Sequence, residues 1–247
     1  MSFIQKLSSA TLSGGGSSAQ SVAFSANPTV GNTIVVPIAV WAPSSISTFT
    51  VSDTAGNSYT VDVFKESLSV AGSYQHSAIA RTTVTATGAN FKITVSDGVS
   101  GSDFFFDAAE FSGGYNVDKT ATASAAHGTT SLTIGPTAAL AGTGEIIVAA
   151  LGVQSSTTNA GISTPATITG PTLSTASTSL AVEQDGNTID GGEFSYAIAS
   201  STAAVTAQWT YSSDSNSGAQ YTGVLAVYAP VGATTIQQQL MMLGVGS

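Results

Sequence analysis

Two acidic residues, Asp107 and Glu110, lie close together in the sequence and are the first candidates for chemistry. Paired carboxylates can hydrolyse a glycoside when they flank the scissile bond at a separation of about 5 to 10 Å. The surrounding segment, FFFDAAEF over 104–111, is typical of a strand, and neighbouring side chains of a strand point to opposite faces. The odd separation therefore places the two carboxylates on opposite faces, which disfavours a catalytic pair within this strand.

A nucleophilic enzyme would need a serine, a histidine and a carboxylate that converge in the fold. The chain has two histidines, His76 and His127, and it has no G-x-S-x-G nucleophile elbow. The GGG run over 14–16 lacks the lysine and the helix that follow in a phosphate-binding loop. We therefore predict no catalytic residues, no cofactor and a protein that is not an enzyme.

Oxygen-rich turns are the candidates for metal binding. The loop VSDTAGNSYT over 51–60 and the loop EQDGNTIDGGE over 183–193 both contain Asp, Asn and Gly. These residue types also suit tight turns, where Asp accepts backbone hydrogen bonds and Gly or Asn adopts a positive φ. Calcium takes roughly six to eight oxygen ligands, more than either loop offers alone. We therefore interpret both loops as turns, predict no metal, and keep four residues as calcium candidates only: Asp53, Asn57, Asp185 and Asp190.

The composition excludes several classes of partner. The net charge is −9 with five Lys and Arg in total, too few and too scattered to neutralise a nucleic-acid backbone. No stretch approaches the roughly 18 apolar residues of a membrane span. There are no cysteines, so disulfides and thiolate metal sites are excluded. The first residues, MSFIQKLSSATLSGGG, hold no apolar run typical of a signal peptide. We expect synthesis in a cytoplasm, with release by lysis or in a virion, or else a processed form.

Strand patterns occupy most of the chain. Segments rich in β-branched and aromatic residues alternate with Gly, Asn, Asp and Pro, and several alternate apolar with polar residues. The clearest are 21–26, 33–41, 47–53, 58–64, 77–84 and 90–97. These patterns predict an all-β protein built as an antiparallel, jelly-roll-like β-sandwich.

An internal repeat is visible in the order of these patterns. Residues 31–41, 73–97 and 104–114 are echoed by 142–153, 192–214 and 221–232, at an offset of about 111 to 118 residues. We predict two similar strand sets, about 20–114 and 120–232. They fit either two small sandwiches or one double sandwich, and we favour one double sandwich with a single apolar interior over 20–232, because the break near 114–120 is too short for a flexible linker.

The two ends differ from the repeat. Residues 1–19 are predicted to be an N-terminal arm, and 233–247 a short tail whose single apolar stripe is compatible with a helix. Such a short helix is marginal alone, so it packs either on its own sandwich or on a partner. The candidate partner-binding residues are Phe3, Ile4, Ile236, Leu240 and Leu243.

Aromatic residues could also bind a sugar by stacking. Trp41 and Trp209 lie within strand patterns, where a core position is more common. Tyr59, Tyr115 and Tyr221 are better candidates for an exposed platform.

Three short motifs resemble a β-sandwich module of tailed-bacteriophage structural proteins and bacterial surface proteins. They are the G-N-T start of a strand at 31–33, the V-x-D-x-x-G-N-x-Y hairpin at 51–59 and the A-E-F-S-G segment at 109–113. The resemblance covers about 20–232 and implies a jelly-roll-like or lectin-like sandwich without a known catalytic set.

The resemblance and the missing signal peptide favour a virion over a bacterial surface. We expect a non-enzymatic virion structural protein of a tailed bacteriophage, most simply a capsid decoration protein or a short head fibre. Its partners would be the major capsid protein or another virion protein, and further copies of itself in a homo-oligomer. The alternative is a carbohydrate-binding or host-adhesion module that recognises a glycan.

Overall fold

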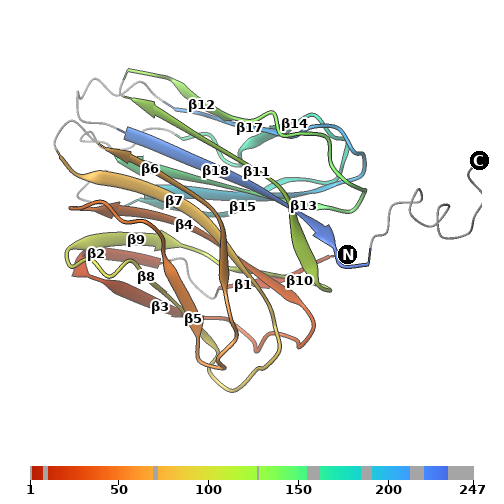
Figure 1. Cartoon of the computed structure of the whole chain (residues 1–247), viewed down its shortest axis with the longest axis horizontal. Helices are drawn as coiled ribbons and strands as arrows, with labels where there is room; N and C mark the ends of the chain where they lie inside the picture. The colour runs from red at the N-terminus through yellow and green to blue at the C-terminus, as the bar shows by residue number, and fades with distance from the viewer. Residues whose placement is uncertain are drawn as a thin grey trace, which may run out of the picture.

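The structure is a computed structural model that describes residues 2–7, 11–68, 72–126, 128–154, 162–184, 191–211 and 220–232. These residues form eighteen β-strands and no helix (Figure 1). No helix capable of crossing a membrane is found among them. The all-β prediction is therefore confirmed, whereas the tail over 233–247, with the helix considered for it, lies outside the described residues.

The first half of the chain forms a sandwich of a large and a small antiparallel sheet. The large sheet has the order β1-β10-β4-β7-β6, and β2 and β9 extend it because β9 also pairs with β4. Its strands are β1 (Phe3–Lys6), β2 (Thr11–Ser17), β4 (Thr33–Ala42), β6 (Thr60–Leu68), β7 (Tyr74–Thr83), β9 (Ser102–Phe106) and β10 (Ala109–Phe111). The small sheet has the order β3-β8-β5, with β3 (Ala19–Ala23), β8 (Lys92–Ser96) and β5 (Thr50–Asp53).

The second half repeats this arrangement. Its large sheet has the order β11-β18-β13-β16-β15 and its small sheet the order β12-β17-β14. The large-sheet strands are β11 (Tyr115–Ala126), β13 (Ile146–Gln154), β15 (Leu173–Gln184), β16 (Gly191–Ala199) and β18 (Gln220–Pro230). The small-sheet strands are β12 (Ser131–Ile134), β14 (Thr167–Thr169) and β17 (Thr206–Thr210).

The strand order identifies each half as a jelly roll. Counted from β11, the second half has a large sheet in the order 1-8-3-6-5 and a small sheet in the order 2-7-4. This is a jelly-roll order in which the fifth strand has joined the large sheet. The first half follows the same order, with its first strand divided into β1 and β2 and its last into β9 and β10. Two similar strand sets, as the repeat predicted, are therefore present.

The four sheets stack in layers, with the two large sheets back to back in the middle (Figure 1). Three apolar clusters separate the layers: one inside each sandwich and one between the large sheets. The prediction of a single apolar interior was therefore wrong. Period-two patterns show which side chains share a face, but they do not show that both faces of a large sheet are covered.

Strand β4 illustrates why the central strands are apolar almost throughout. Val36 and Ile38 pack into the core of the first sandwich, while Val35 and Ala39 pack between the large sheets. A strand covered on both faces buries every side chain, so it reads as a continuous apolar run. Pro37 lies within β4 opposite the break between β9 and β10, where its carbonyl oxygen accepts from Asp107 N (3.3 Å). Its ring nitrogen faces the same break, so the missing N–H costs no ladder hydrogen bond and the proline is tolerated.

The N-terminal segment, expected as an arm, belongs to the first large sheet. Strand β1 pairs with β10, and β2 pairs with β9. Phe3 stacks on Tyr196 of the second sandwich with ring centroids 5.2 Å apart, and meets Phe111 edge-on at 6.0 Å. Phe3 is therefore engaged within its own chain, whereas Ile4 is 47% exposed.

Candidate functional site

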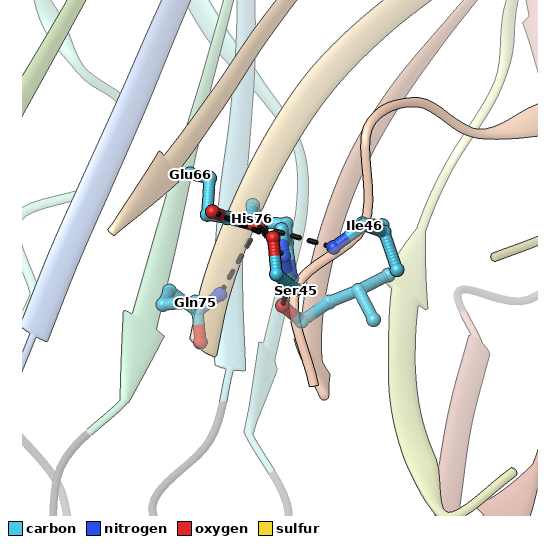
Figure 2. A network of polar contacts seen from close by, with 6 residues as sticks. Ser45, Ile46, Glu66, Gln75 and His76 are labelled. Carbon is cyan, nitrogen blue, oxygen red and sulfur yellow. Dashed lines mark hydrogen bonds and ion pairs between the residues drawn. The ribbon is translucent and has the colours of Figure 1, made fainter. Parts of the chain in front are cut away.

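Three residues of the types used in nucleophilic catalysis meet at one end of the first sandwich (Figure 2). Glu66 on β6 lies opposite His76 on β7, and His76 Nε2 is 2.9 Å from Glu66 Oε2. Ser45, in the loop after β4, donates from Oγ to the same carboxylate, at 3.0 Å to Oε1 and 2.8 Å to Oε2. This is the strongest candidate for a reactive site in the part of the chain that the structure describes.

The order of contacts in this network does not suit nucleophilic catalysis. A catalytic histidine lies between the serine and the carboxylate, whereas here Glu66 lies between Ser45 and His76. The other ring nitrogen of His76, Nδ1, is 3.3 Å from the carbonyl oxygen of Val40. Neither ring nitrogen has a serine as its hydrogen-bond partner.

Burial and charge explain what the network does instead. His76 is fully buried beside the rings of Phe49, Phe64 and Tyr74, and this burial lowers its pKa despite the neighbouring Glu66. Burial alone would raise the pKa of Glu66, but hydrogen bonds from Ser45, His76 and the Ile46 amide outweigh it and lower that pKa. The charged Glu66 thus fastens the loop after β4 to the β6–β7 pair.

Sequence reasoning missed this network, although a signal for it existed. The strands predicted at 58–64 and 77–84 form the β6–β7 ladder, and its register places Glu66 directly opposite His76. Pairing these two strands as a hairpin and extending them toward their loop would have brought Glu66 opposite His76. Ser45 could not have been found in this way, since its position depends on how a loop folds.

Asp53 is engaged by its own turn. Its Oδ1 accepts from the amides of Ala55 (2.9 Å) and Asn57 (3.2 Å). Its Oδ2 accepts from Asn57 Nδ2 (2.8 Å) and from the Tyr59 hydroxyl (3.0 Å). The Asp-to-Ala55 bond, two residues on, is the contact that the turn interpretation expects.

Asn57 connects this turn to the segment after β7. Its side-chain Oδ1 accepts from the amides of Thr85 (2.8 Å) and Ala86 (2.9 Å), and its Nδ2 donates to the Ala86 carbonyl oxygen (2.9 Å). Within the described ranges no three His, Asp or Glu side chains gather as they would around a metal ion. The calcium candidates Asp185 and Asp190 lie outside the described residues.

The other two motifs are joined to each other. Asn32 Nδ2 donates to Glu110 Oε1 (2.5 Å), and Asn32 Oδ1 accepts from the Gly113 amide (2.9 Å). Thr33 Oγ1 donates to the Gly113 carbonyl oxygen (2.9 Å) and accepts from the Tyr115 amide (3.0 Å). The start of β4 and the end of β10 are thereby locked together.

Asp107 and Glu110 do not share one strand as the sequence pattern predicted, because the segment is interrupted at 107–108 between β9 and β10. The two carboxyl groups have separate partners, and Glu110 accepts from Gln5, Thr29 and Asn32. Asp107 lies 3.7 Å from Lys6, whose ammonium group also donates to the Leu180 carbonyl oxygen of the other sandwich. Burial raises the pKa of Asp107 to about 6, although Lys6 and two backbone amides act against it.

The proposed sugar-stacking tyrosines are not exposed. Tyr115 and Tyr221 are buried, 1% and 0% exposed, so neither can stack on a sugar in this fold. Tyr59 is half-buried and donates to Asp53, and these two factors, burial first, raise its pKa. Trp209 occupies the core position expected of it, where its Nε1 donates to Glu193 Oε2 (2.5 Å).

The fold and these contacts define a protein of two jelly rolls stacked through their large sheets. No family model, no curated protein and no solved structure matches the chain. The partner-binding candidates Ile236, Leu240 and Leu243 lie outside the described residues.

Proposed function

We propose that this chain is a non-enzymatic structural protein of a tailed-bacteriophage virion, either a capsid decoration protein or a short head fibre. The observation that carries the proposal is the role of the motif residues that resemble phage structural modules. Asn32, Asp53, Asn57 and Glu110 all make hydrogen bonds that hold turns and strand ends of their own fold. Residues with such contacts stabilise the fold and are not arranged for a reaction.

The protein would act by packing against the surface of the phage head. Of the five cations, Lys6, Arg81 and Lys119 already form ion pairs inside the chain. The remaining surface is rich in Ser, Thr and Gly, which can be covered without burying unpaired charge. Repeated copies can therefore pack at low desolvation cost, as a head surface requires.

The terminal segment over 233–247 would provide the attachment. It follows β18 after Val231 and Gly232, and it carries Ile236, Leu240 and Leu243, the apolar residues expected to contact the major capsid protein. Deletion of 233–247 should abolish binding to phage heads that lack the protein, while the remaining chain keeps its β circular dichroism and cooperative melting. Co-sedimentation with the heads measures the binding, and a truncated chain that still co-sediments would refute this attachment.

A matched variant separates apolar docking from simple loss of length. Replacing Ile236, Leu240 and Leu243 with serine keeps the tail but removes its apolar side chains, and should also abolish co-sedimentation. Val231→Ser, at a 63% exposed residue next to the tail, is the control and should bind normally. The full chain applied to a glycan array tests the adhesion alternative, and saturable binding there would redirect the proposal to a host-recognition module.

A further inference from the structure

Two carboxyl groups of the second sandwich hold consecutive backbone amides. Asp118 lies at an irregularity in β11, where the register with β18 shifts between Val117 and Lys119. Its Oδ2 accepts from the Ala141 amide (3.0 Å). Glu145, just before β13, accepts on Oε1 from the Gly142 amide (2.6 Å). The two acids together clamp the turn at 141–142 against the start of β11.

The two carboxyl groups accept from the amides of neighbouring residues, so they lie against the same short segment of backbone. Glu145 is fully buried, and its Oε2 has no hydrogen-bond partner in the described chain. Burying an unpaired charge beside a second carboxylate is costly, so this arrangement favours a proton on one of the two groups.

The neighbouring charges show which group holds that proton. Lys119 Nζ is 2.5 Å from Asp118 Oδ1, so the ammonium group stabilises the ionised form of Asp118. Burial would raise the pKa of Asp118, but hydrogen bonds from Lys119 and Ala141 outweigh it and lower that pKa. Burial first, and then the charge of Asp118, raise the pKa of Glu145 to about 7.

The large sheet of the first sandwich packs against β11, and its charged residues Arg81 and Asp62 pair with each other. Arg81 Nε lies 3.1 Å from Asp62 Oδ2, and Arg81 Nη1 donates to the Tyr115 carbonyl oxygen (2.9 Å). Asp118 and Lys119 are the charged groups that act on the titration of Glu145.

We propose that Asp118 and Glu145 form a proton-operated clamp, which fastens the turn at 141–142 to β11 while one of them is protonated and loosens when both are ionised. The change is local, because bonds without ionisable groups hold both flanks of the turn. The Leu140 amide donates to the Thr202 carbonyl oxygen (2.9 Å), and the Gly144 amide to the Ala199 carbonyl oxygen (2.7 Å). The clamp does not depend on the proposed virion role.

Amide NMR of the full chain tests this proposal. Between about pH 5 and about pH 9, the Gly142 and Ala141 resonances should titrate together with a midpoint near the Glu145 pKa of about 7. The Gly113 amide, which donates to the neutral Asn32 side chain, is the internal control and should not follow this titration. A Gly142 resonance that stays constant over this range would overturn the proposal.

Two variants assign the titration to the pair. Glu145→Gln should abolish the Gly142 midpoint, because the side chain no longer ionises. Asp118→Asn should keep a titration but shift its midpoint to lower pH, because the neighbouring negative charge is gone. A midpoint that both variants leave unchanged would assign the titration elsewhere and refute the clamp. Calcium chloride added at about pH 8 should leave Gly142 unmoved, and recovery of its low-pH position would mean that a cation, rather than a proton, joins the acids.

Discussion

The side-chain amide of Asn57 bridges Asp53 and the segment after β7. It donates to Asp53 Oδ2 at 2.8 Å, while its carbonyl oxygen accepts from the Thr85 and Ala86 amides at 2.8 and 2.9 Å. One buried side chain therefore fixes the β5–β6 turn and the loop behind it. Asp53 and Asn57, two of the calcium candidates, thus hold a turn in place through their hydrogen bonds.

Asn57→Ala should strongly destabilise the fold. The substitution leaves the Thr85 and Ala86 amides and the Ala86 carbonyl oxygen without their side-chain partner, and each group left unsatisfied away from water costs about 1 to 3 kcal/mol. We expect a loss of about 3 kcal/mol in the free energy of unfolding, measured by urea denaturation. Thr87→Ala, at an exposed position in the adjoining loop, should change stability by less than about 0.5 kcal/mol. Equal effects of the two substitutions would contradict the role of Asn57.

Calcium should have no effect on this turn. Both oxygens of Asp53 already accept hydrogen bonds from donors within its own hairpin, so a cation would have to displace four of them. The melting temperature should therefore be the same with EDTA and with millimolar calcium chloride. A calcium-dependent rise in the melting temperature that Asp53→Asn abolishes would establish a metal site here.

The strand content and the repeat could be predicted because each half carries the same order of apolar runs. Strands β4 and β13 are buried on both faces, so each is a long apolar run that stands out in the sequence. The turn at Asp53 was also readable, since its contacts are local in the chain.

The arrangement of layers could not be predicted in the same way. Tyr115 begins an otherwise half-exposed strand, and its burial comes from the cluster between the two large sheets. Phe3 looked like part of a free arm because its partners, Phe111 and Tyr196, are distant in sequence. Contacts between sheets leave no periodic signal, so neither the burial of Tyr115 nor the docking of Phe3 could be read from the sequence.

Phe3→Ala should weaken the contact between the two sandwiches. The ring packs on Tyr196 and Phe111, one from each sandwich, and its loss should cost about 2 kcal/mol. Ile4→Ala provides a matched control on the same strand, since Ile4 is 47% exposed, and should cost less than about 0.5 kcal/mol. Thermal and urea denaturation measure both. If Ile4→Ala were the more damaging substitution, the placement of β1 would be wrong.

Gly152→Ala should force the large sheets apart. A Cβ at this position would lie 2.5 Å from Gln75 Nε2, 2.7 Å from Ser77 Oγ and 3.0 Å from the His76 carbonyl oxygen. Overpacking of this kind costs about 1 to 3 kcal/mol, which urea denaturation can resolve. Gly88→Ala meets no atom within 4 Å and should be neutral or slightly stabilising. Equal stability of the two variants would argue against close approach of the sheets at Gly152.

Stability should fall as pH rises from about 5 to about 8. Burial is the main cause that raises the pKa values of Asp107, Glu145 and Glu193, to about 6, about 7 and about 7. These groups keep protons in the folded state that the unfolded chain has released, so unfolding becomes easier as pH increases. Three groups with lowered pKa values act in the opposite direction: His76 below about pH 6.5, and Glu66 and Asp118 below about pH 5, so the fall in stability shows above about pH 5. We expect a loss on the order of 2 kcal/mol between about pH 5 and about pH 8, measured by urea denaturation.

Glu193→Gln checks the cause of this pH dependence, and we expect the substitution to make stability depend less on pH. The new amide side chain can still accept from Trp209 and hydrogen-bond to Ser195 without a charge to bury, so the variant should exceed the parent in stability at about pH 8. Glu110→Gln is the contrasting variant, because Glu110 accepts from Gln5, Thr29 and Asn32, and an NH₂ group would face these donors. It should destabilise the chain at every pH. A Glu193→Gln variant with an unchanged pH profile would show that Glu193 is ionised in the folded state.

Localisation on the particle tests the central claim most directly. Under the proposed function a tailed phage encodes the chain, so particles of that phage would be purified, examined for the chain by mass spectrometry and imaged by cryo-electron microscopy. The proposal predicts repeated copies on the head, each with density that fits two stacked jelly rolls. Absence of the chain from purified particles, or its confinement to a host-binding tip, would contradict a structural role on the head.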